Sequence, residues 1–467
     1  MGPFVRHALS VWLVAFLLPV LIAPLSARAA EWKAGVARVK ITPRRAMWMS
    51  GYASRDRPAE GTLIDLWAKA LALDDGEGHR AVLVTMDLCG IDRDLSGRVC
   101  EAIESKHHLD RASIALCVSH THSGPVVGNN LRPMYGLDER QSKLVDEYAA
   151  ELETNLVSVA GESLASLAPA RLEWGVGRAT FAVNRRNNKE EDVTRLREEG
   201  KLQGPVDHDV PVLVVRTPGR GGDGKPLAIV FGYACHATTL SFYQWSGDWP
   251  GFAQIEIEKA YPGATALFVA GCGADQNPLP RRTVELARRY GSEAASGVGT
   301  AIGASLNPVA GALRMSYSEI ELPFAELPTR EQVEKDAASK DRYVAGRAKL
   351  LLSQWDRDGK LSPTYPYPVQ VWRLGAGPTI VFLGGEVVVD YSLRLKRELG
   401  PEKTWVASYS NDVMAYVPSL RVLKEGGYEG GGAMLYYGLP APWGEQIEQR
   451  IESEVVRQVR RLTSGNP

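Results

Sequence analysis

Short apolar runs rich in β-branched residues alternate with amphipathic stretches along most of this chain, and the alternation restricts the folds it can adopt. Apolar runs of about four to eight residues are typical of buried strands, whereas apolar residues repeating at helical spacing are typical of helices that cover a sheet. The pattern therefore predicts an α/β fold, with large mixed sheets covered by helices in a single compact catalytic domain.

The predicted strands cover residues 66–73, 81–87, 113–118, 172–182, 211–216, 228–234, 266–269, 314–322, 379–382 and 404–408. The predicted helices cover residues 93–106, 139–167, 251–260, 283–306, 329–354, 388–398 and 445–462. A glycine-rich turn at 219–224 predicts a hairpin between the strands on either side of it.

Residues 1–29 have the composition of an export signal. A basic start containing Arg6 precedes an apolar stretch at 8–25, and Ala27-Arg28-Ala29 offers a small-x-small cleavage site. Because Pro19 and Pro24 interrupt the apolar stretch, a cleaved signal is favoured over an uncleaved membrane anchor. We therefore expect a signal peptide at 1–29 and an exported protein, either periplasmic or extracellular.

Charge and cysteine content argue against several classes of protein. The chain has 54 Lys and Arg residues and 55 Asp and Glu residues, so it lacks the excess of basic residues that is typical of nucleic-acid-binding proteins. At most peripheral contact with a membrane is expected. Five cysteines, an odd number, are too few for a disulfide scaffold, although one disulfide remains open. The sequence contains no Cys-x-x-Cys pair, so a zinc site with thiolate ligands is not expected.

Three histidines follow predicted strands directly. His120 and His122 lie in the Ser-His-Thr-His-Ser-Gly-Pro segment after the strand ending at 118, and His236 follows the strand at 228–234. In α/β sheets, ligands gather beyond the carboxyl ends of strands, and neutral imidazole is a common metal ligand and a general base. One such histidine alone is more often a hydrogen-bonded core residue, but three of them, with a His-x-His pair, predict a shared site.

A metal site of this kind also needs a carboxylate, because catalytic zinc usually takes three protein ligands from His, Asp and Glu. Glu386 follows two glycines at the end of a predicted strand, and glycines there let the backbone approach a ligand closely. The sequence equally allows Glu386 to be an ordinary carboxylate at the N-terminus of the following helix.

The order of these and further motifs resembles the neutral/alkaline non-lysosomal ceramidases, a family of zinc amidases that hydrolyse the N-acyl bond of ceramide. The matching segments in chain order are 35–43, 119–125, 184–185, 235–238, 246–248, 385–386, 410–412, 416–417 and 428–429. Each segment is a weak match by itself, and their shared order makes the set stronger.

Carried over by position, the resemblance implies zinc as the cofactor, with ligands at His120, His236, Glu386 and Tyr416. Composition alone would not have selected Tyr416, which would otherwise be assigned as a half-buried core tyrosine. The implied function is that of an exported zinc-dependent amidohydrolase acting on ceramide or a related N-acyl lipid.

The resemblance also implies which residues line the reacting side of the metal. His122 would take a proton from water and return it to the leaving amine, and Arg185 and Tyr428 would stabilise the oxyanion. Without the resemblance, Arg185 would as readily be a surface charge in the polar run 184–191.

The sequence departs from the family in a loop and at its end. The loop at 271–278 lacks the family's serine and has Asp275 in its place, which puts a mechanism requiring that hydroxyl in doubt. Cys272 is a poor substitute nucleophile, because no basic neighbour in the sequence lowers its pKa. Residues 30–467 are expected to form the ceramidase-like zinc hydrolase domain, without the C-terminal immunoglobulin-like domain common in the family.

The substrate is less closely defined by the sequence. An aromatic-rich segment at 242–252 either forms one wall of an acyl groove or packs its own loop. The alternatives are a zinc esterase or peptidase acting on another substrate, and a non-catalytic lipid-binding homologue. The expected partner is a small-molecule lipid or N-acyl amide, not a nucleic acid, and the sequence does not indicate an oligomeric state.

Overall fold

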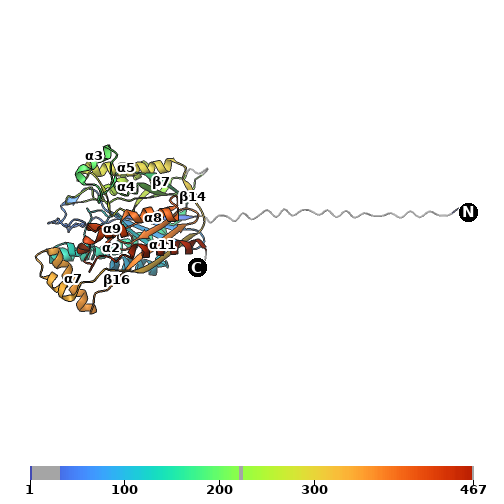
Figure 1. Cartoon of the computed structure of the whole chain (residues 1–467). Coiled ribbons are helices and arrows are strands. Elements are labelled where there is room, and N and C mark those ends of the chain that lie inside the picture. Colours follow the sequence, from blue (N-terminus) through green and yellow to red (C-terminus); the bar gives the residue numbers. More distant parts are fainter. Residues whose placement is uncertain (3–31, 220–223, 465–467) are drawn as a thin grey trace.

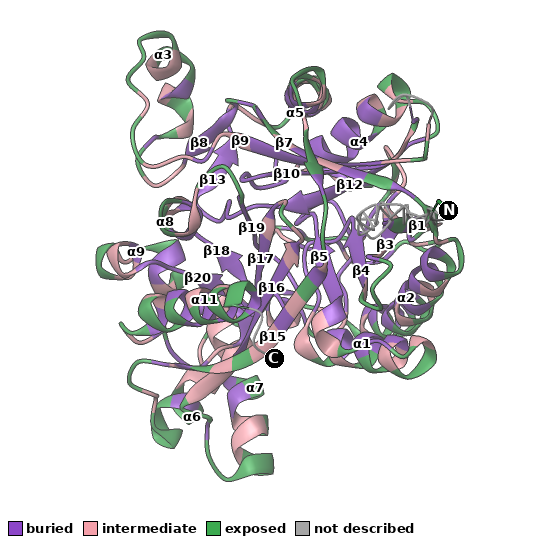
Figure 2. Ribbon diagram, turned by 90° about the vertical axis from the view of Figure 1, so that its right-hand side faces the viewer, coloured by how far each residue is buried: buried purple, intermediate pink, exposed green. Residues whose placement is uncertain are grey.

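The computed structural model describes residues 1–2, 32–219 and 224–464, so the predicted signal peptide lies almost wholly outside the described residues. The described chain is a mixed α/β protein in which sheets form the interior and helices lie outside them (Figure 1). Strands are largely buried, whereas helices expose their outer faces (Figure 2). This is the predicted fold class.

The first sheet has the strand order β5-β4-β3-β1-β6. Its strands are β1 (Lys33–Lys40), β3 (Trp67–Asp74), β4 (Arg80–Met86), β5 (Ile114–Val118) and β6 (Ala168–Pro169). All pairs are antiparallel except β4 with β5, which is parallel. Helix α2 (Glu139–Ala165) covers this sheet, and α1 (Arg93–His107) packs against α2.

The second sheet has the order β12-β10-β9-β7-β14. Its strands are β7 (Arg171–Arg178), β9 (Asp209–Arg216), β10 (Pro226–Tyr233), β12 (Thr265–Ala270) and β14 (Asn307–Val309). Only β10 and β12 pair in parallel. Helices α4 (Asp248–Ala260) and α5 (Val284–Gly303) cover it. Strands β9 and β10 pair antiparallel, as expected for the predicted hairpin, whereas residues 220–223 of the glycine-rich turn lie outside the described residues.

The third sheet has the order β15-β16-β17-β19, and again its last pair is parallel. Its strands are β15 (Leu313–Pro323), β16 (Thr364–Leu374), β17 (Thr379–Leu383) and β19 (Thr404–Ala407). Helix α8 (Val389–Leu399) packs on β19, and α11 (Ile447–Ser464) packs on β15 and β16.

Most of the other regular elements are short. They are β2 (Gly61–Thr62), β8 (Ala182–Asn184), α3 (Val193–Glu198), β11 (Gln244–Trp245), β13 (Gln276–Pro278), α6 (Arg330–Ala337), α7 (Arg342–Asp358), β18 (Glu386–Val387), β20 (Tyr416–Val417), α9 (Leu420–Glu425) and α10 (Met434–Tyr437), with helical turns η1 (Arg111–Ser113), η2 (Arg132–Met134), η3 (Glu190–Asp192) and η5 (Tyr428–Gly432).

Burial on both faces of the sheets explains the apolar runs in the sequence. In β3, Leu71 and Leu73 belong to a central cluster shared by the three large sheets, whereas Ala70 and Ala72 belong to the cluster that includes residues of α2. Side chains alternate between the faces of a strand, so a strand buried on both faces is apolar throughout.

Each large sheet contains one pair of parallel strands, and the positions of these three pairs determine where a site can form. A helix joins the two strands of each parallel pair: α1 joins β4 to β5, α4 joins β10 to β12, and α8 joins β17 to β19. The second strand of each pair is an edge strand. Backbone bonds from Val118 to Tyr409 and from Ser408 to Ala270 hold these edges together, so the carboxyl ends of the pairs meet at one place.

Several predicted elements differ from the structure. The strand expected at 172–182 is β7, which ends at Arg178, followed by the separate β8, and β1 was not among the predicted strands. The single helix expected at 329–354 is two helices, α6 and α7, separated at 338–341, because Asp341 accepts bonds from Tyr343 N and Val344 N and so begins a new helix. Strand β16 was not predicted, since it contains Pro366 and Pro368, which argue against a strand with neighbours on both sides.

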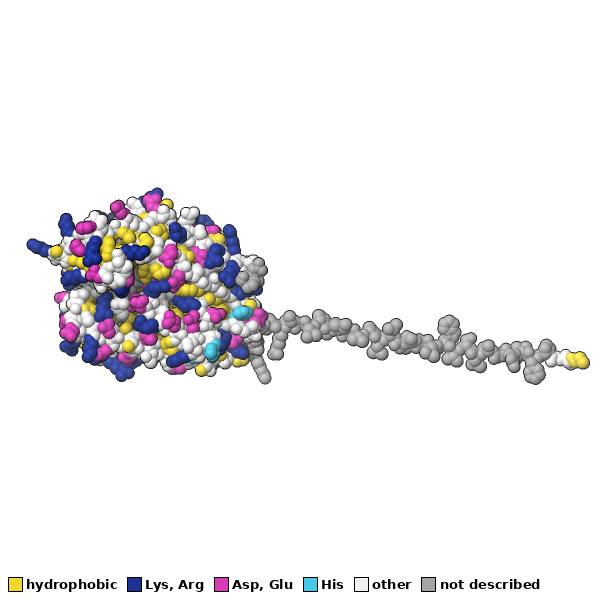
Figure 3. All heavy atoms as spheres, turned by 90° about the horizontal axis from the view of Figure 1, so that it is seen from below, with side chains coloured by type: hydrophobic (Ala, Val, Ile, Leu, Met, Phe, Trp, Pro, Cys, Tyr) yellow, Lys and Arg dark blue, Asp and Glu magenta, His cyan; other side chains and the backbone are white. Residues whose placement is uncertain are grey.

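The surface of the described residues carries both positive and negative side chains (Figure 3), in agreement with the nearly equal numbers of basic and acidic residues in the sequence. The face seen in Figure 3 has charges of both signs interspersed with scattered apolar side chains. All five cysteines are buried free thiols. Among the described helices, none is both long and apolar enough to cross a bilayer.

Candidate metal centre and active site

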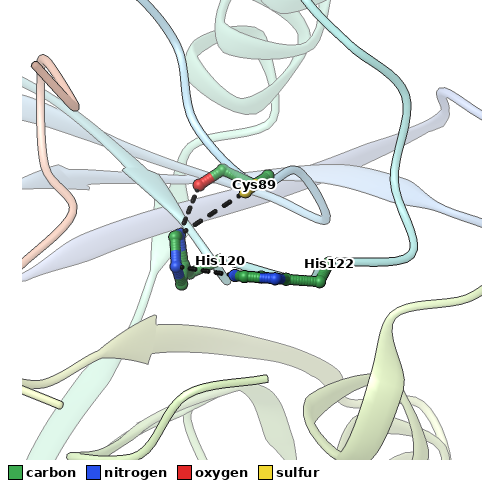
Figure 4. A group of neighbouring side chains, drawn as sticks. All are labelled: Cys89, His120 and His122. Atoms are coloured by element: carbon green, nitrogen blue, oxygen red, sulfur yellow. Dashed lines mark hydrogen bonds between the residues drawn. The ribbon is translucent and has the colours of Figure 1, made fainter. Parts of the chain in front are cut away.

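His120 is the first of the predicted ligands, and its protonated nitrogen is fixed by the backbone. It lies two residues beyond β5 with a φ of 58°, and its ring is buried and stacked on Tyr409 at 4.4 Å between centroids. Its Nδ1 donates to the Cys89 carbonyl at 2.6 Å (Figure 4). The neutral ring therefore presents the lone pair of Nε2 to the site.

His236 is oriented in the same way from the second sheet. It follows β10 and is buried, and its Nδ1 donates to the Gly273 carbonyl at 2.7 Å. The indole of Trp249 donates to the His236 carbonyl at 2.9 Å and holds the backbone. Here too Nε2 faces the site.

Glu386 begins β18, shortly after β17 of the third sheet, and is a ligand candidate rather than a helix-end carboxylate. Its Oε2 lies 3.0 Å from His120 Nε2 and 3.1 Å from His236 Nε2. Gly385 has a φ of +73°, and a Cβ there would lie 2.7 Å from the Ala415 carbonyl, so this close approach requires glycine. The glycines before Glu386 thus let β18 lie against β20.

Tyr416 is the register partner of Glu386 in the parallel β18–β20 pair. Its hydroxyl lies 3.2 Å from His236 Nε2 and accepts a bond from Arg185 Nη2 at 3.1 Å. Tyr416 is buried, and it joins the cluster only through this pairing.

These four side chains fit a zinc ion. With both Nδ1 atoms donating to carbonyls, the neutral imidazoles have no proton to donate at Nε2, and Glu386 Oε2 is buried with no hydrogen-bond partner in the part of the chain that the structure describes. Acceptor atoms about 3 Å apart repel one another unless a cation or proton lies between them. Two imidazole nitrogens, a carboxylate oxygen and a phenol oxygen form a donor set that suits zinc.

The pKa values describe where a proton lies if no cation is bound. Burial lowers the pKa of His120, but the Glu386 carboxylate outweighs it and raises that pKa to about 10. Burial lowers the pKa of His236 to about 4. Burial raises the pKa of Glu386, yet His120 holds it well below its usual range. A cation would replace the proton shared by His120 and Glu386.

Cys89 also approaches His120 but does not extend the metal cluster. Its Sγ lies 3.8 Å from His120 Nδ1, the nitrogen that donates to the Cys89 carbonyl (Figure 4). Since that nitrogen holds a proton when Nε2 binds metal, Cys89, His120 and His122 do not form a separate thiolate site.

His122 lies against the cluster with its Nε2 3.0 Å from His120 Nε2. Its Nδ1 is buried, and none of the described residues forms a hydrogen bond with it. Burial, with the neighbouring His120 and His236, lowers its pKa well below the usual value. The ring fits because Gly51 has no side chain: a Cβ on Gly51 would lie 2.3 Å from His122 Cγ. Sequence reasoning missed Gly51, since nothing in its surroundings distinguishes it from an ordinary turn glycine.

Arg185 and Tyr428 complete the predicted set on the outer side of the cluster. Arg185 is not a free surface charge, because Nε donates to Glu429 at 2.7 Å and Nη1 to Asn277 at 3.3 Å. Its side chain is 20% exposed. Tyr428 is 42% exposed, and its ring lies 5.1 Å from that of Tyr416, so it stands between the cluster and solvent.

The loop at 271–278, which lacks the family's serine, holds other residues of the site in place. Gly273 accepts from His236, and the Asp275 carbonyl accepts from Arg185 N at 2.8 Å. The Asp275 carboxylate accepts from Val389 N at 2.9 Å and from Asn184 Nδ2 at 3.0 Å. Cys272 is fully buried, and burial raises the pKa of its thiol, which argues against a thiolate nucleophile.

The aromatic segment after His236 mostly packs the interior. Trp245, Trp249 and Phe252 are buried, whereas Phe242 and Tyr243 are half-buried. The three buried rings therefore support the loop and do not line an open groove.

The structure thus brings together all seven predicted site residues, contributed by the segments that follow β5, β8 and β10, by the short pair β18–β20, and by η5. Fold and site define a class: a mixed α/β protein whose buried histidine–carboxylate cluster has the donor set of a mononuclear metal centre.

The sequence model of the family described as neutral/alkaline non-lysosomal ceramidase, N-terminal, matches residues 32–277. This is more than half of the chain, and the chain belongs to that family. The matched residues include His120, His122, Arg185 and His236, whereas Glu386, Tyr416 and Tyr428 lie beyond them.

Curated relatives are similar over part of their length. Neutral ceramidase B of Dictyostelium discoideum is 27% identical over 245 residues, covering 48% of this chain and 32% of the relative. Neutral ceramidase 2 of Arabidopsis thaliana is 31% identical over 121 residues, covering 25% of this chain and 16% of the relative. The aligned part therefore spans about a third or less of these relatives.

Solved structures share the fold over nearly the whole chain. Neutral ceramidase from Pseudomonas aeruginosa superposes with a TM-score of 0.70 at 19% identity, covering 94% of this chain and 75% of that one. A structure of a ceramidase complexed with C2 gives a TM-score of 0.71 at 18% identity, covering 94% and 76% of the two chains.

Proposed function

We propose that this protein is an exported zinc-dependent amidohydrolase that cleaves the N-acyl amide bond of ceramide or a related N-acyl lipid. One observation supports the metal centre. Glu386 Oε2 lies 3.0 Å from His120 Nε2 and 3.1 Å from His236 Nε2, all three atoms lie within 4.8 Å of one another, and the carboxylate oxygen has no hydrogen-bond partner among the described residues. Family membership supports the reaction class. Export rests on the composition of residues 1–29.

Zinc held by His120, His236, Glu386 and Tyr416 would supply Lewis acidity, which polarises a carbonyl and makes water a stronger acid. Residues of the chain itself then accept and donate the protons. Because His122 is neutral, one of its ring nitrogens carries a lone pair that can accept a proton from the attacking water. The acyl carbon gains the hydroxyl, the C–N bond breaks, and His122 returns the proton to the departing amine.

Arg185 and Tyr428 are the proposed donors to the oxyanion that forms as the amide carbon becomes tetrahedral. The three bonds of Arg185 to Glu429, Asn277 and Tyr416 fix its guanidinium before substrate arrives. A donor fixed in this way contributes about 3–4 kcal/mol to transition-state stabilisation.

Metal analysis of purified protein, with His120→Ala and His236→Ala beside the control His79→Ala, tests the centre. His79 is paired with Asp75 in a turn, away from the cluster. Wild type and the control should bind zinc, and the two site variants should not. Equal zinc binding by all four proteins would reject the centre.

A substrate panel tests the reaction. Turnover of a fluorogenic N-acyl sphingosine should be abolished by a chelator and restored by zinc. Hydrolysis of esters or peptides in its place would favour the zinc esterase or peptidase, and zinc binding without any turnover would favour the non-catalytic lipid-binding homologue.

A further inference from the structure

The two oxygens of the Glu386 carboxylate have different surroundings. Oε1 accepts a hydrogen bond from the Tyr437 hydroxyl, whereas Oε2 faces the two imidazole Nε2 atoms and has no hydrogen-bond partner within residues 32–219 and 224–464. Glu386 is 3% exposed and Tyr437 is 9% exposed, so water does not compete freely for either group. No other hydrogen bond to Oε1 occurs among the described residues.

We propose that Tyr437 is a positioning residue that occupies Glu386 Oε1 and leaves Oε2 alone to bind the cation. This inference rests on the proposed metal centre. A carboxylate can bind a metal through one oxygen or through both, and an oxygen that already accepts a hydrogen bond is the poorer ligand of the two. The phenol therefore selects binding through one oxygen and fixes the direction of that oxygen.

The structure holds Tyr437 firmly enough for this role. It is the last residue of α10, and the following Gly438 has a φ of +74°, where a Cβ would lie 2.5 Å from Leu350 Cδ2 of α7. The same segment begins at Tyr428, whose carbonyl accepts from Ala433 N at 2.9 Å. The residue that orients the carboxylate and the proposed oxyanion donor thus belong to one short segment of chain.

The variant Tyr437→Phe removes only the hydroxyl and keeps the ring. Its zinc dissociation constant, measured by competition with a chromophoric chelator, should rise about 10–100-fold, as expected for loss of a group that orients a ligand. The absorption spectrum of the cobalt-substituted protein should change as well, because it reports the number and arrangement of ligands. Neither readout depends on catalysis.

The matched control is Tyr436→Phe. Tyr436 precedes Tyr437 in α10, and no hydrogen bond of its hydroxyl occurs among the described residues. Its ring contacts Tyr343 and Tyr428. Zinc affinity and the cobalt spectrum of this control should match those of wild type.

A double-mutant cycle shows whether Tyr437 acts through Glu386. In a Glu386→Ala background, Tyr437→Phe should change zinc affinity no further, because its target is gone. Wild-type affinity and spectrum in Tyr437→Phe, or effects that add fully in the double variant, would overturn the proposal. Unfolding of zinc-free Tyr437→Phe would assign the hydroxyl to folding and would also overturn it.

Zinc binding and hydrolysis by the wild-type protein distinguish failure of the Tyr437 proposal from failure of the proposed function. Wild-type protein that binds zinc but hydrolyses no N-acyl lipid refutes the proposed function and still allows the affinity test of Tyr437. Wild-type protein that binds no zinc refutes both.

Discussion

Replacing Gly51 by alanine should reduce turnover by about a hundredfold while leaving the fold and the zinc content intact. The added Cβ would lie 2.3 Å from Cγ, 2.5 Å from Nδ1 and 2.7 Å from Cβ of His122. Carbon atoms in contact are normally about 3.5–4 Å apart, so the imidazole must move by about 1 Å or more. A displacement of this size in a catalytic group lowers the rate by about two orders of magnitude.

Backbone strain must be separated from displacement of the ring. Gly51 has a φ of +96°, which is unfavourable for alanine and destabilises the fold by about 1–3 kcal/mol. Gly78 has a φ of +104° with no atom within 4 Å of an added Cβ, so Gly78→Ala carries similar strain without touching His122. Both variants should lose similar stability in thermal unfolding, apart from what the clash adds to Gly51→Ala.

The assay compares kcat of the zinc-loaded variants on an N-acyl sphingosine, with zinc content measured in the same samples. The expected result is a kcat for Gly51→Ala about a hundredfold below that of Gly78→Ala, at equal zinc content. Equal kcat values in the two variants would refute the role of the His122 position. Loss of zinc from Gly51→Ala would show that the clash disturbs the ligands instead.

Four further predictions concern the metal, two residues of the loop at 271–278, and a buried carboxyl group. Removing zinc should lower the melting temperature, because ligand at about a hundred times its Kd stabilises by about 2.7 kcal/mol; an unchanged melting temperature would contradict a bound ion. Cys272→Ala should keep kcat within about twofold, and a loss of several orders of magnitude would indicate a thiol nucleophile. Asp275→Ala should lower the free energy of unfolding in urea by about 2–4 kcal/mol, because it leaves Val389 N–H and the Asn184 amide without their acceptor; a negligible change would contradict this. Burial raises the pKa of Glu452 to about 7. The protonated carboxyl group therefore contributes its full stabilisation below about pH 4.5, and this contribution is lost as the pH rises through 7. Glu452→Gln should therefore gain melting temperature over wild type between pH 5 and pH 8, and a constant difference would contradict the raised pKa.

The sequence predicted the strands that precede the candidate ligands better than it predicted the candidate ligands themselves. The apolar runs before His120, His236 and Glu386 correspond to β5, β10 and β17, because strands buried on both faces have a continuous apolar signal. For Glu386 two roles remained open, since spacing along the chain does not reveal which way a carboxylate faces.

Other members of the site have no local signal. Tyr416 enters the cluster through its register with Glu386 across the β18–β20 pair, and only the family resemblance indicated it. Tyr437 was missed altogether, because a tyrosine ending a four-residue helix is not distinguished by its neighbours. The break at 338–341 and the proline-containing β16 were missed because capping and tertiary pairing outweigh the periodicity of the apolar residues.

By itself, then, the sequence determined the α/β class, the apolar strands and the histidines that end two of them, since these depend on residues adjacent in the chain. The tertiary structure decided which strand ends meet, which nitrogen of each imidazole holds the proton, and which carboxylate oxygen is free. These depend on contacts between residues far apart in the chain, such as the carbonyls of Cys89 and Gly273 and the hydroxyl of Tyr437. Only the folded arrangement of the three sheets sets such contacts.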